Sequence, residues 1–279
     1  MPIAKRNRSD LNESMRDWDS LAEKDALWAI LTDASKANGK WDIAEFMATG
    51  DAEIETVMDH LATISCTPMT NGSALDFGCG VGRLTQSIAT RFTSCIGVDI
   101  SRQMIQRAVF LNRHAHCQYV AHSDIKLPFA DGSFVFIYSN IVLQHLPRRL
   151  SMEYLREFVR VLAPDGVLVF GVQDSFGVRD SRSLLFRVRQ QLRIRSRIKR
   201  LLKIGSADMM MHCMPESVVC EALGTAVVVD VQLTNTAAKD FNGRVKYLQR
   251  APTTGYIGKQ YCVMKAPRPC PSRQESGSL

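Results

Sequence analysis

Residues 75–84 read Leu-Asp-Phe-Gly-Cys-Gly-Val-Gly-Arg-Leu, and this stretch decides the fold. An apolar strand pattern runs into three glycines at alternating positions, Gly78, Gly80 and Gly82, after which a helical pattern begins. Glycine tolerates positive φ angles and lets a ligand lie against the backbone, close to the positive end of the helix dipole. The stretch therefore predicts a strand, a ligand-binding loop and a helix. The alternative is an ordinary turn between strand and helix, with Asp76 as a solvated or capping acid.

Two acids beside the loop indicate which ligand it binds. Asp99 ends the next predicted strand, 21 residues after Gly78, at a place from which a carboxylate hydrogen-bonds ribose hydroxyls in nucleotide-type sites. Asp76 stands two residues before Gly78, where a carboxylate repels the pyrophosphate of a dinucleotide but attracts the ammonium and sulfonium of S-adenosylmethionine. Arg83 also occupies the place of the third glycine in G-x-G-x-x-G. The charges therefore favour S-adenosylmethionine over a nicotinamide cofactor.

The pattern of the chain changes at residue 73. Before it, apolar residues recur at helical spacings, which predicts an N-terminal helical cap over residues 1–72. After it, short apolar runs alternate with helical stretches, which predicts an α/β fold with a doubly wound, mostly parallel sheet over residues 73–265. The predicted strands are 74–77, 95–98, 118–121, 134–138, 167–172, 226–233 and 261–265. Residues 266–279 contain proline, serine and glycine and predict a disordered tail.

The composition is that of a globular protein. The chain has 279 residues, of which 46% are hydrophobic and 23% charged, and a net charge of +7. It contains no run of 18 apolar residues, so no membrane-spanning helix is expected. Residues 1–10 are basic but lack the apolar stretch of a secretory signal, and the eight cysteines form no C-x-x-C pair. We therefore expect a reduced, cytoplasmic protein without a zinc ribbon or a disulfide framework.

The excess of basic over acidic residues is concentrated in one segment of the chain. Residues 179–203 contain ten basic residues and one acid, Asp180, so they carry +9 and the rest of the chain carries 7 − 9 = −2. The segment mixes apolar residues with its arginines and has a single aromatic residue, Phe186, which leaves little platform for stacking bases. This composition suits peripheral contact with an anionic membrane surface, or an amphiphilic anionic substrate. A solvated lid helix is the plain alternative.

These motifs resemble class I S-adenosylmethionine-dependent methyltransferases of the small-molecule type, whose loop reads LDxGCGxGR. The resemblance extends from about residue 73 to residue 171. It also rests on five later segments: 99–104, 123–129, 131–134, 140–146 and 162–166. It implies a Rossmann-like sheet of seven strands, with one of the last two strands antiparallel and a lid inserted at about 173–210.

The resemblance also implies a set of cofactor-binding residues. Asp99 is similar to the ribose-binding acid, with Ile100 and Met104 as an apolar floor under the adenine. Asp124 is similar to the adenine-binding acid, with the backbone N–H of Ile125 beside it. The remaining implied contacts are Asp76, Gly78, Cys79, Gly80 and Asn140.

Methyl transfer is an in-line displacement at an activated carbon, so the enzyme mainly aligns the reactants. A hydroxyl or carbon-acid acceptor must also lose a proton. His145, after the fourth predicted strand, is the predicted base, and His212 is similar to a position that faces the pocket in relatives. The plain alternative for both is a structural histidine. No catalytic metal is predicted, because the sequence lacks the clustered acids of metal-dependent relatives.

The predicted reaction is methyl transfer to an O or C atom of a small molecule of lipid-like or glycosyl type. Nucleic acid is disfavoured as acceptor, because residues 139–142 lack both the Asn/Asp-Pro-Pro-Tyr of exocyclic-amine methylation and the Pro-Cys of cytosine methylation. Three alternatives stay open: a non-catalytic protein that binds adenosylmethionine or a partner, an RNA methyltransferase guided by the basic segment, and, least favoured by charge, a nicotinamide oxidoreductase. The acceptor, its nucleophilic atom and the oligomeric state are left open by the sequence.

Overall fold

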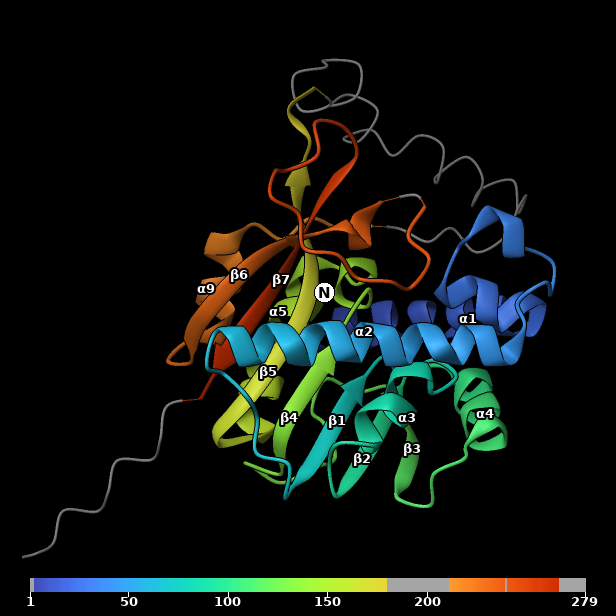
Figure 1. The fold of residues 1–279 in the computed structure, drawn as a ribbon, viewed down its shortest axis with the longest axis horizontal. Coiled ribbons are helices and arrows are strands. Elements are labelled where there is room, and N and C mark those ends of the chain that lie inside the picture. The colour runs from blue at the N-terminus through green and yellow to red at the C-terminus, as the bar shows by residue number, and fades with distance from the viewer. Residues whose placement is uncertain (1–2, 180–210, 239, 266–279) are drawn as a thin grey trace, which may run out of the picture.

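The computed structural model describes residues 3–179, 211–238 and 240–265 (Figure 1). Seven strands form one sheet in the order β3-β2-β1-β4-β5-β7-β6. They are β1 (Ser73–Phe77), β2 (Ser94–Asp99), β3 (Cys117–Ala121), β4 (Phe134–Ser139), β5 (Leu162–Phe176), β6 (Val227–Thr234) and β7 (Tyr256–Met264). The first five strands pair in parallel, whereas β7 is antiparallel to both β5 and β6. The predicted α/β class, with a doubly wound, mostly parallel sheet of seven strands, is confirmed.

The central strands are buried because helices cover both faces of the sheet, as is usual for parallel strands. In register, Asp76 of β1 lies beside Gly97 of β2 and Tyr138 of β4. The carboxyl ends of β1, β2, β4 and β5 therefore meet at one edge of the sheet. Open α/β sheets bind their ligands at this edge.

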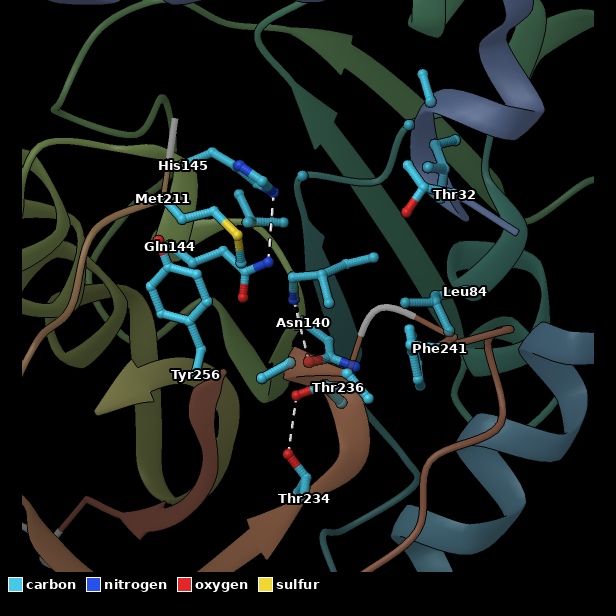
Figure 2. Close-up of a pocket in the computed structure, with 18 of the residues that line it drawn as sticks. Thr32, Leu84, Asn140, Gln144, His145, Met211, Thr234, Thr236, Phe241 and Tyr256 are labelled. Carbon is cyan, nitrogen blue, oxygen red and sulfur yellow. Dashed lines mark hydrogen bonds between the residues drawn. The ribbon is translucent and has the colours of Figure 1, made fainter. Parts of the chain in front are cut away.

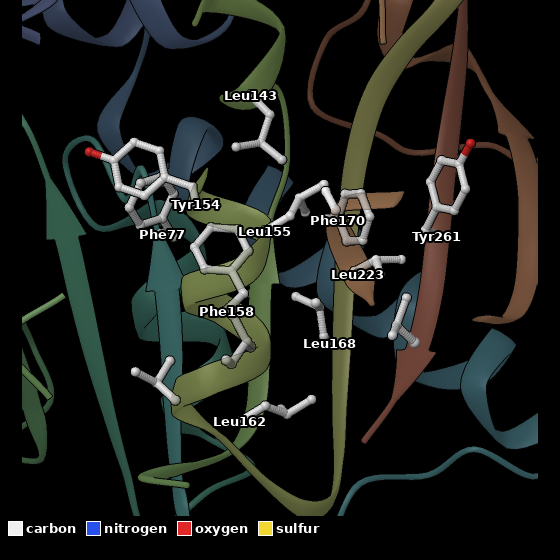
Figure 3. Packing of buried hydrophobic residues seen from close by; sticks show 14 of the residues in the cluster. Phe77, Leu143, Tyr154, Leu155, Phe158, Leu162, Leu168, Phe170, Leu223 and Tyr261 are labelled. Carbon is white, nitrogen blue, oxygen red and sulfur yellow. The ribbon is translucent and has the colours of Figure 1, made fainter. Parts of the chain in front are cut away.

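One face of the sheet is covered by α5 (Arg148–Val161) and α9 (Glu216–Leu223). Apolar residues recur along α5 at three- and four-residue spacings and turn one stripe toward the sheet. There Phe158 packs edge-on against Phe77, with ring centroids 4.9 Å apart, and Phe170 stacks on Tyr261 (Figure 3). The first contact anchors α5 at the carboxyl end of β1, and the second joins β5 to β7.

The opposite face is covered by α2 (Ile43–Thr63) and α3 (Arg83–Ala89), while α4 (Arg102–Leu111) packs against β2 and β3. Asp42 caps the N-terminus of α2, because its carboxylate accepts a hydrogen bond from Glu45 N. It then runs across the sheet, and Ile54, Val57 and Leu61 pack into the core on this side (Figure 1). The second helix of the predicted cap therefore also belongs to the helical layer of the sheet.

The first helix, α1 (Ile3–Ile30), is interrupted at Asp25 and packs over the end of the sheet. It shares a core cluster with Trp41 and Phe46 at the start of α2, with Val81 of the glycine loop and with Met104 of α4. The predicted cap thus contacts the loop directly. Its boundary at residue 72 stays a prediction.

Two strands extend beyond their predicted limits. β5 runs on past Val172 to Phe176, and β7 begins at Tyr256 instead of residue 261, because the two strands pair antiparallel over this whole length. Residues 173–176 are therefore strand and not lid. Residues 180–210, which hold most of the expected lid and basic segment, and residues 266–279, the expected tail, lie outside the described residues. No described helix combines the length and the apolar character needed to cross a membrane.

Candidate active site

A cavity of about 1430 Å³ opens over the carboxyl ends of β1, β2, β4 and β5 (Figure 2). One part of its wall comes from residues 77–84 and 98–104. The other part comes from α1, from residues 140–146 and from residues 234–256. Pockets for one small molecule usually have volumes of about 300–1,000 Å³. The cavity therefore has room for two ligands side by side.

The glycine loop has the backbone conformation that the sequence predicts. Gly78 and Gly80 have φ angles of +78° and +52°. A Cβ atom on Gly78 would collide with Val142, and one on Gly80 would come within 2.5 Å of Ile30. Both positions therefore need glycine for conformation and for space. Gly78, Cys79 and Gly80 all line the cavity and present bare backbone to it.

Asp99 lies beside the glycine loop and is hydrogen-bonded to it. Its Oδ2 accepts a hydrogen bond of 2.9 Å from Gly80 N, and its Oδ1 accepts one of 2.8 Å from Ser101 N. Burial raises the pKa of Asp99 to about 6, although these two N–H donors lower it. Asp99, Ile100 and Met104 all line the cavity. The structure thus brings a carboxylate and two apolar side chains together beside the bare backbone of the loop.

Asp76 lies beneath the loop. Its side chain is buried, and its Oδ2 accepts a hydrogen bond of 2.6 Å from Thr85 Oγ1. Burial raises the pKa of this carboxyl to about 7. Asp76 is not among the described residues that line the cavity. A contact between Asp76 and a ligand ammonium therefore stays a prediction.

Asp124 and Ile125 are placed differently from the other predicted contacts. Asp124 is exposed, its Oδ1 accepts a hydrogen bond from Ile125 N at 2.6 Å, and its carbonyl accepts one from Tyr154. Neither residue is among the described lining residues, whereas His122 from the same loop is. The structure therefore does not bring these two residues into the cavity wall. Their adenine-binding role stays a prediction.

Asn140 directly follows β4 and lines the cavity (Figure 2). Its Oδ1 accepts a hydrogen bond from Ile141 N, and its Nδ2 donates one of 2.7 Å to Glu53 Oε1. A Cβ atom on Gly171 of β5 would collide with Asn140 Oδ1, so the neighbouring strand leaves space for this amide. The sequence analysis missed Glu53. Its signal is an acid on the apolar stripe of α2, next to Ile54.

His145 lies in a 3-10 turn, η2 (Leu143–His145), and lines the cavity. Its ring meets Trp18 of α1 edge-on, with centroids 5.5 Å apart. Nε2 of Gln144 lies 3.4 Å from Nε2 of His145 (Figure 2). Gln144 Oε1 accepts a hydrogen bond of 2.9 Å from Gln173 Nε2. The structure thus places His145 beside the cavity between an aromatic ring and an oriented amide. The sequence analysis missed both glutamines.

His212 is not among the described residues that line the cavity. Its backbone N–H donates a hydrogen bond of 2.7 Å to Gln144 O. Its neighbour Met211 reaches the cavity in its place (Figure 2). His212 is thus bonded to the residue that precedes His145 but lies outside the described cavity wall, and its catalytic role stays a prediction.

The remaining wall combines aromatic and apolar side chains with polar and charged ones. It includes Trp18, Phe176, Met211, Phe241 and Tyr256, which come from α1, the end of β5 and the segments after residue 210. Thr234 and Thr236 add hydroxyl groups, which hydrogen-bond each other at 2.8 Å. Further lining residues are polar or charged: Asn235, Asp240, Asn242, Arg244 and Lys246. This half of the cavity therefore suits a bulky ligand that has both an apolar surface and polar or charged groups.

Within residues 3–179, 211–238 and 240–265, no group of three or more His, Cys, Asp or Glu side chains is arranged to hold a metal ion.

Comparisons with known proteins agree with this geometry. Residues 75–170 match a family model described as a methyltransferase domain. The chain is 30% identical over 170 residues to 27-O-demethylrifamycin SV methyltransferase of Amycolatopsis mediterranei, a match that covers 57% of this chain and 58% of that protein. It is 31% identical over 129 residues to malonyl-[acyl-carrier protein] O-methyltransferase of Halorhodospira halophila. This match covers 43% of this chain and 41% of that protein. The chain spans less than two thirds of the length of these and the other first curated relatives that it matches.

The fold is similar to that of magnesium protoporphyrin IX methyltransferase from Synechocystis PCC 6803, whose crystal structure contains bound SAH. The TM-score is 0.55 and the sequence identity 13%, with 91% of this chain and 98% of that chain covered. At this identity the likeness concerns the fold.

The fold and the cavity together define a doubly wound α/β domain with a nucleotide-type ligand site at the carboxyl edge of its sheet. Residues 75–170 match a methyltransferase domain, as the sequence predicts, and the fold is similar to that of a methyltransferase crystallised with bound SAH; the predicted cofactor is S-adenosylmethionine. The described residues fit this cofactor, because bare loop backbone, the Asp99 carboxylate and the apolar side chains of Ile100 and Met104 share one wall.

Proposed function

We propose that this protein transfers a methyl group from S-adenosylmethionine to an oxygen or carbon atom of a small molecule. The observation that carries the proposal is the hydrogen bond of 2.9 Å between Gly80 N and the Asp99 carboxylate, at the wall of a cavity too large for the cofactor alone. The names of the two relatives support an oxygen acceptor, since one acts on 27-O-demethylrifamycin SV and the other is an O-methyltransferase.

The cofactor half of the cavity binds the cofactor through the backbone of the glycine loop and through the Asp99 carboxylate. Gly78, Cys79 and Gly80 let the cofactor lie against the chain, and Asp99 accepts hydrogen bonds from its ribose hydroxyls. Met104 packs under the adenine. When bound, S-adenosylmethionine supplies a methyl group on a sulfonium, which is already activated for displacement. The buried Asp76 carboxylate favours this positive charge from beneath the loop.

The acceptor half of the cavity selects the second substrate. Its wall joins aromatic side chains such as Trp18 and Tyr256 to the charged Asp240, Arg244 and Lys246, which supports a bulky amphiphilic acceptor of lipid-like or glycosyl type. His145 takes the proton of the acceptor hydroxyl or carbon acid on a ring nitrogen, and Trp18 and Gln144 hold its ring in place. The residues of this chain thus align two reactants and remove one proton.

Calorimetric binding tests the proposal. We expect the wild-type protein to bind S-adenosylmethionine and S-adenosylhomocysteine but not NADH, and Asp99→Ala to weaken binding of both by roughly 1–3 kcal/mol. Glu55→Ala, which removes an exposed carboxylate on α2, is the matched control and should leave both affinities unchanged. A folded wild-type protein that binds neither adenosyl ligand would overturn the proposal. Binding without turnover of any acceptor, in a screen of lipid-like and glycosyl alcohols, would favour the non-catalytic alternative.

A further inference from the structure

Residues 244–248 run beside the end of β6 and are fixed there by one side chain. Asn235, the first residue of η3 (Asn235–Ala237), donates a hydrogen bond of 3.0 Å from Nδ2 to Arg244 O. Its Oδ1 accepts one of 2.8 Å from Lys246 N, and its own N–H donates one of 3.2 Å to Lys246 O. The backbone at Arg244 and Lys246 is therefore held in place beside the sheet.

The side chains of this segment alternate between the core and the cavity. Val245 is buried in the core cluster that α1 and α2 share, whereas Arg244 and Lys246 are exposed. Residues 244, 246 and 248 line the cavity, and residues 245 and 247 are not among the described lining residues. Alternate residues of an extended chain point to the same side, so the side chains of Arg244 and Lys246 form this part of the wall.

The two cations lie close enough to bind one group together. An extended chain rises by about 3.3 Å per residue, so residues two positions apart are separated by roughly 7 Å. The long side chains of Arg244 and Lys246 can converge over this distance. Arginine donates two parallel hydrogen bonds to a carboxylate or a phosphate, and lysine adds a compact positive charge.

Neither cation has a carboxylate partner among the described residues. Asp240 lines the same cavity but forms no ion pair with Arg244 or Lys246. The other arginine of the described wall, Arg83, is paired with Glu53. A solvated surface charge is the plain alternative for each exposed cation. Two cations on one side of a fixed segment, at the edge of a cavity with aromatic side chains, suit an anionic group on an apolar body.

We infer that Arg244 and Lys246 bind an anionic group of the methyl acceptor, a carboxylate or a phosphate, while the apolar body of the acceptor lies against the aromatic part of the wall. The inference rests on the proposed function, because it names the class of molecule that enters the acceptor half of the cavity. The acceptor is then an amphiphilic anion.

Three probes with the same alkyl chain test this class: decanoate, decyl phosphate and the uncharged decanol. Calorimetry measures their binding to protein saturated with S-adenosylhomocysteine. We expect the wild-type protein to bind at least one of the two anions at least tenfold more tightly than decanol. The anion that binds more tightly identifies the group as a carboxylate or a phosphate.

Replacing Arg244 and Lys246 together by glutamine removes both charges and keeps polar side chains. The Kd of the preferred anion should rise at least tenfold, while the Kd of decanol stays within twofold. Because both side chains are exposed, the temperature of thermal unfolding should not change. The charge-matched control replaces Arg91 and Arg250, which are exposed and are not among the described lining residues, and it should leave every Kd within twofold of wild type.

The outcomes are distinct. Wild-type protein that binds neither anion more tightly than decanol would overturn the inference, and so would equal losses in the double variant and in the control. The Kd of S-adenosylhomocysteine should stay within twofold in the double variant; a selective rise would assign the two cations to the carboxylate of the cofactor and overturn the inference. Wild-type protein that does not bind S-adenosylhomocysteine would overturn the proposed function, and the same three probes, used without it, would still show whether the two cations bind an anion.

Discussion

Ser101 Oγ donates a hydrogen bond of 2.6 Å to Asp19 Oδ1 and so joins α1 to the turn after β2. The same oxygen accepts a hydrogen bond from Met104 N and caps α4, while Ser101 N donates to Asp99. One serine therefore connects the first helix of the chain to the predicted ribose-binding acid. The N-terminal helix is tied to the cofactor half of the cavity by this bond as well as by apolar packing.

Asp19→Ala should lower the free energy of unfolding by about 0.5–1.5 kcal/mol, because Ser101 loses one hydrogen-bond partner. Urea denaturation measures this change. Glu23→Ala removes an exposed carboxylate from the same helix and should have no effect. If both variants lose the same stability, the bond between Asp19 and Ser101 contributes nothing of its own.

The raised pKa of Asp99 predicts how cofactor affinity depends on pH. Burial raises this pKa to about 6, and the protonated acid is a poorer acceptor for ribose hydroxyls. The affinity for S-adenosylhomocysteine should therefore fall as the pH drops below about 6, by up to tenfold per pH unit. Calorimetry between pH 5 and pH 8 checks this dependence. In Asp99→Asn the dependence around pH 6 should vanish; if it persists, another group, such as Asp76, controls it.

The same shift gives the sign of the stability change in the ligand-free protein. Because the pKa of Asp99 lies above its ordinary value of 3.8, the folded state binds this proton more tightly than the unfolded state. The contribution of Asp99 to the free energy of unfolding should therefore decrease as the pH rises from about 4 to about 6. Urea denaturation of wild type and Asp99→Asn across this range measures it, and parallel curves for the two proteins would contradict it.

Gly50→Ala should destabilise the protein although alanine is the better helix former by about 1 kcal/mol. Gly50 lies inside α2, and a Cβ atom there would come within 2.5 Å of Arg83 O. We expect a loss of about 1–3 kcal/mol in the free energy of unfolding, because α2 must move away from the loop. Asp59→Ala, at an exposed position of α2, should be neutral or stabilising. A gain of stability in Gly50→Ala would show that this close contact is not required.

His145→Ala should lower kcat by roughly 10²–10⁴-fold with the cognate acceptor, because the proposed base is lost. The Kd of S-adenosylmethionine should change little, since the cofactor-binding loop is untouched. Steady-state kinetics and calorimetry on the same preparation separate the two quantities. Normal turnover of His145→Ala would mean that His145 only packs against Trp18. His212→Ala is the matched comparison, because His212 lies outside the described cavity wall.

The basic segment predicts binding to anionic membranes. Replacing Arg193, Arg195 and Arg197 by alanine should weaken binding to phosphatidylserine vesicles by up to about 1 kcal/mol for each arginine. Co-sedimentation at two salt concentrations measures the loss. Replacing the exposed Arg91, Arg102 and Arg107 is the charge-matched control. Unchanged vesicle binding together with lost RNA binding would favour the RNA alternative.

The cofactor half of the site could be predicted from the sequence because its determinants are local. The positive φ angles of Gly78 and Gly80 belong to a turn that a few neighbouring residues define. Asp99 directly follows an apolar strand pattern, at a distance from the glycines that is usual in this kind of fold. The mostly parallel sheet could also be predicted, because short apolar runs alternate with helical stretches along the chain. Positions that depend on distant partners could not be predicted. Glu53 contacts Arg83 and Asn140 only after α2 has packed on the sheet. Gln173 of β5 bonds Gln144 in the turn η2, 29 residues earlier in the chain.

Strand lengths and loop positions were predicted less well for the same reason. Residues 173–176 and 256–260 show little strand pattern alone, and each segment is extended because the other pairs with it. Asp124 shares the motif of the family, yet its side chain turns to the N–H of its neighbour Ile125. A motif fixes the order of residues along the chain, whereas the orientation of a loop side chain depends on its surroundings.

The two-part wall of the cavity has a consequence for engineering. The family match ends at residue 170, and most of the aromatic surface comes from α1, the end of β5 and residues 211–256. The proposed acceptor half thus draws largely on residues outside the family match, while His145 lies within it. A graft of residues 211–256 from a related chain could exchange the accepted molecule while the glycine loop and Asp99 stay intact, which makes the scaffold a natural starting point for chimeras.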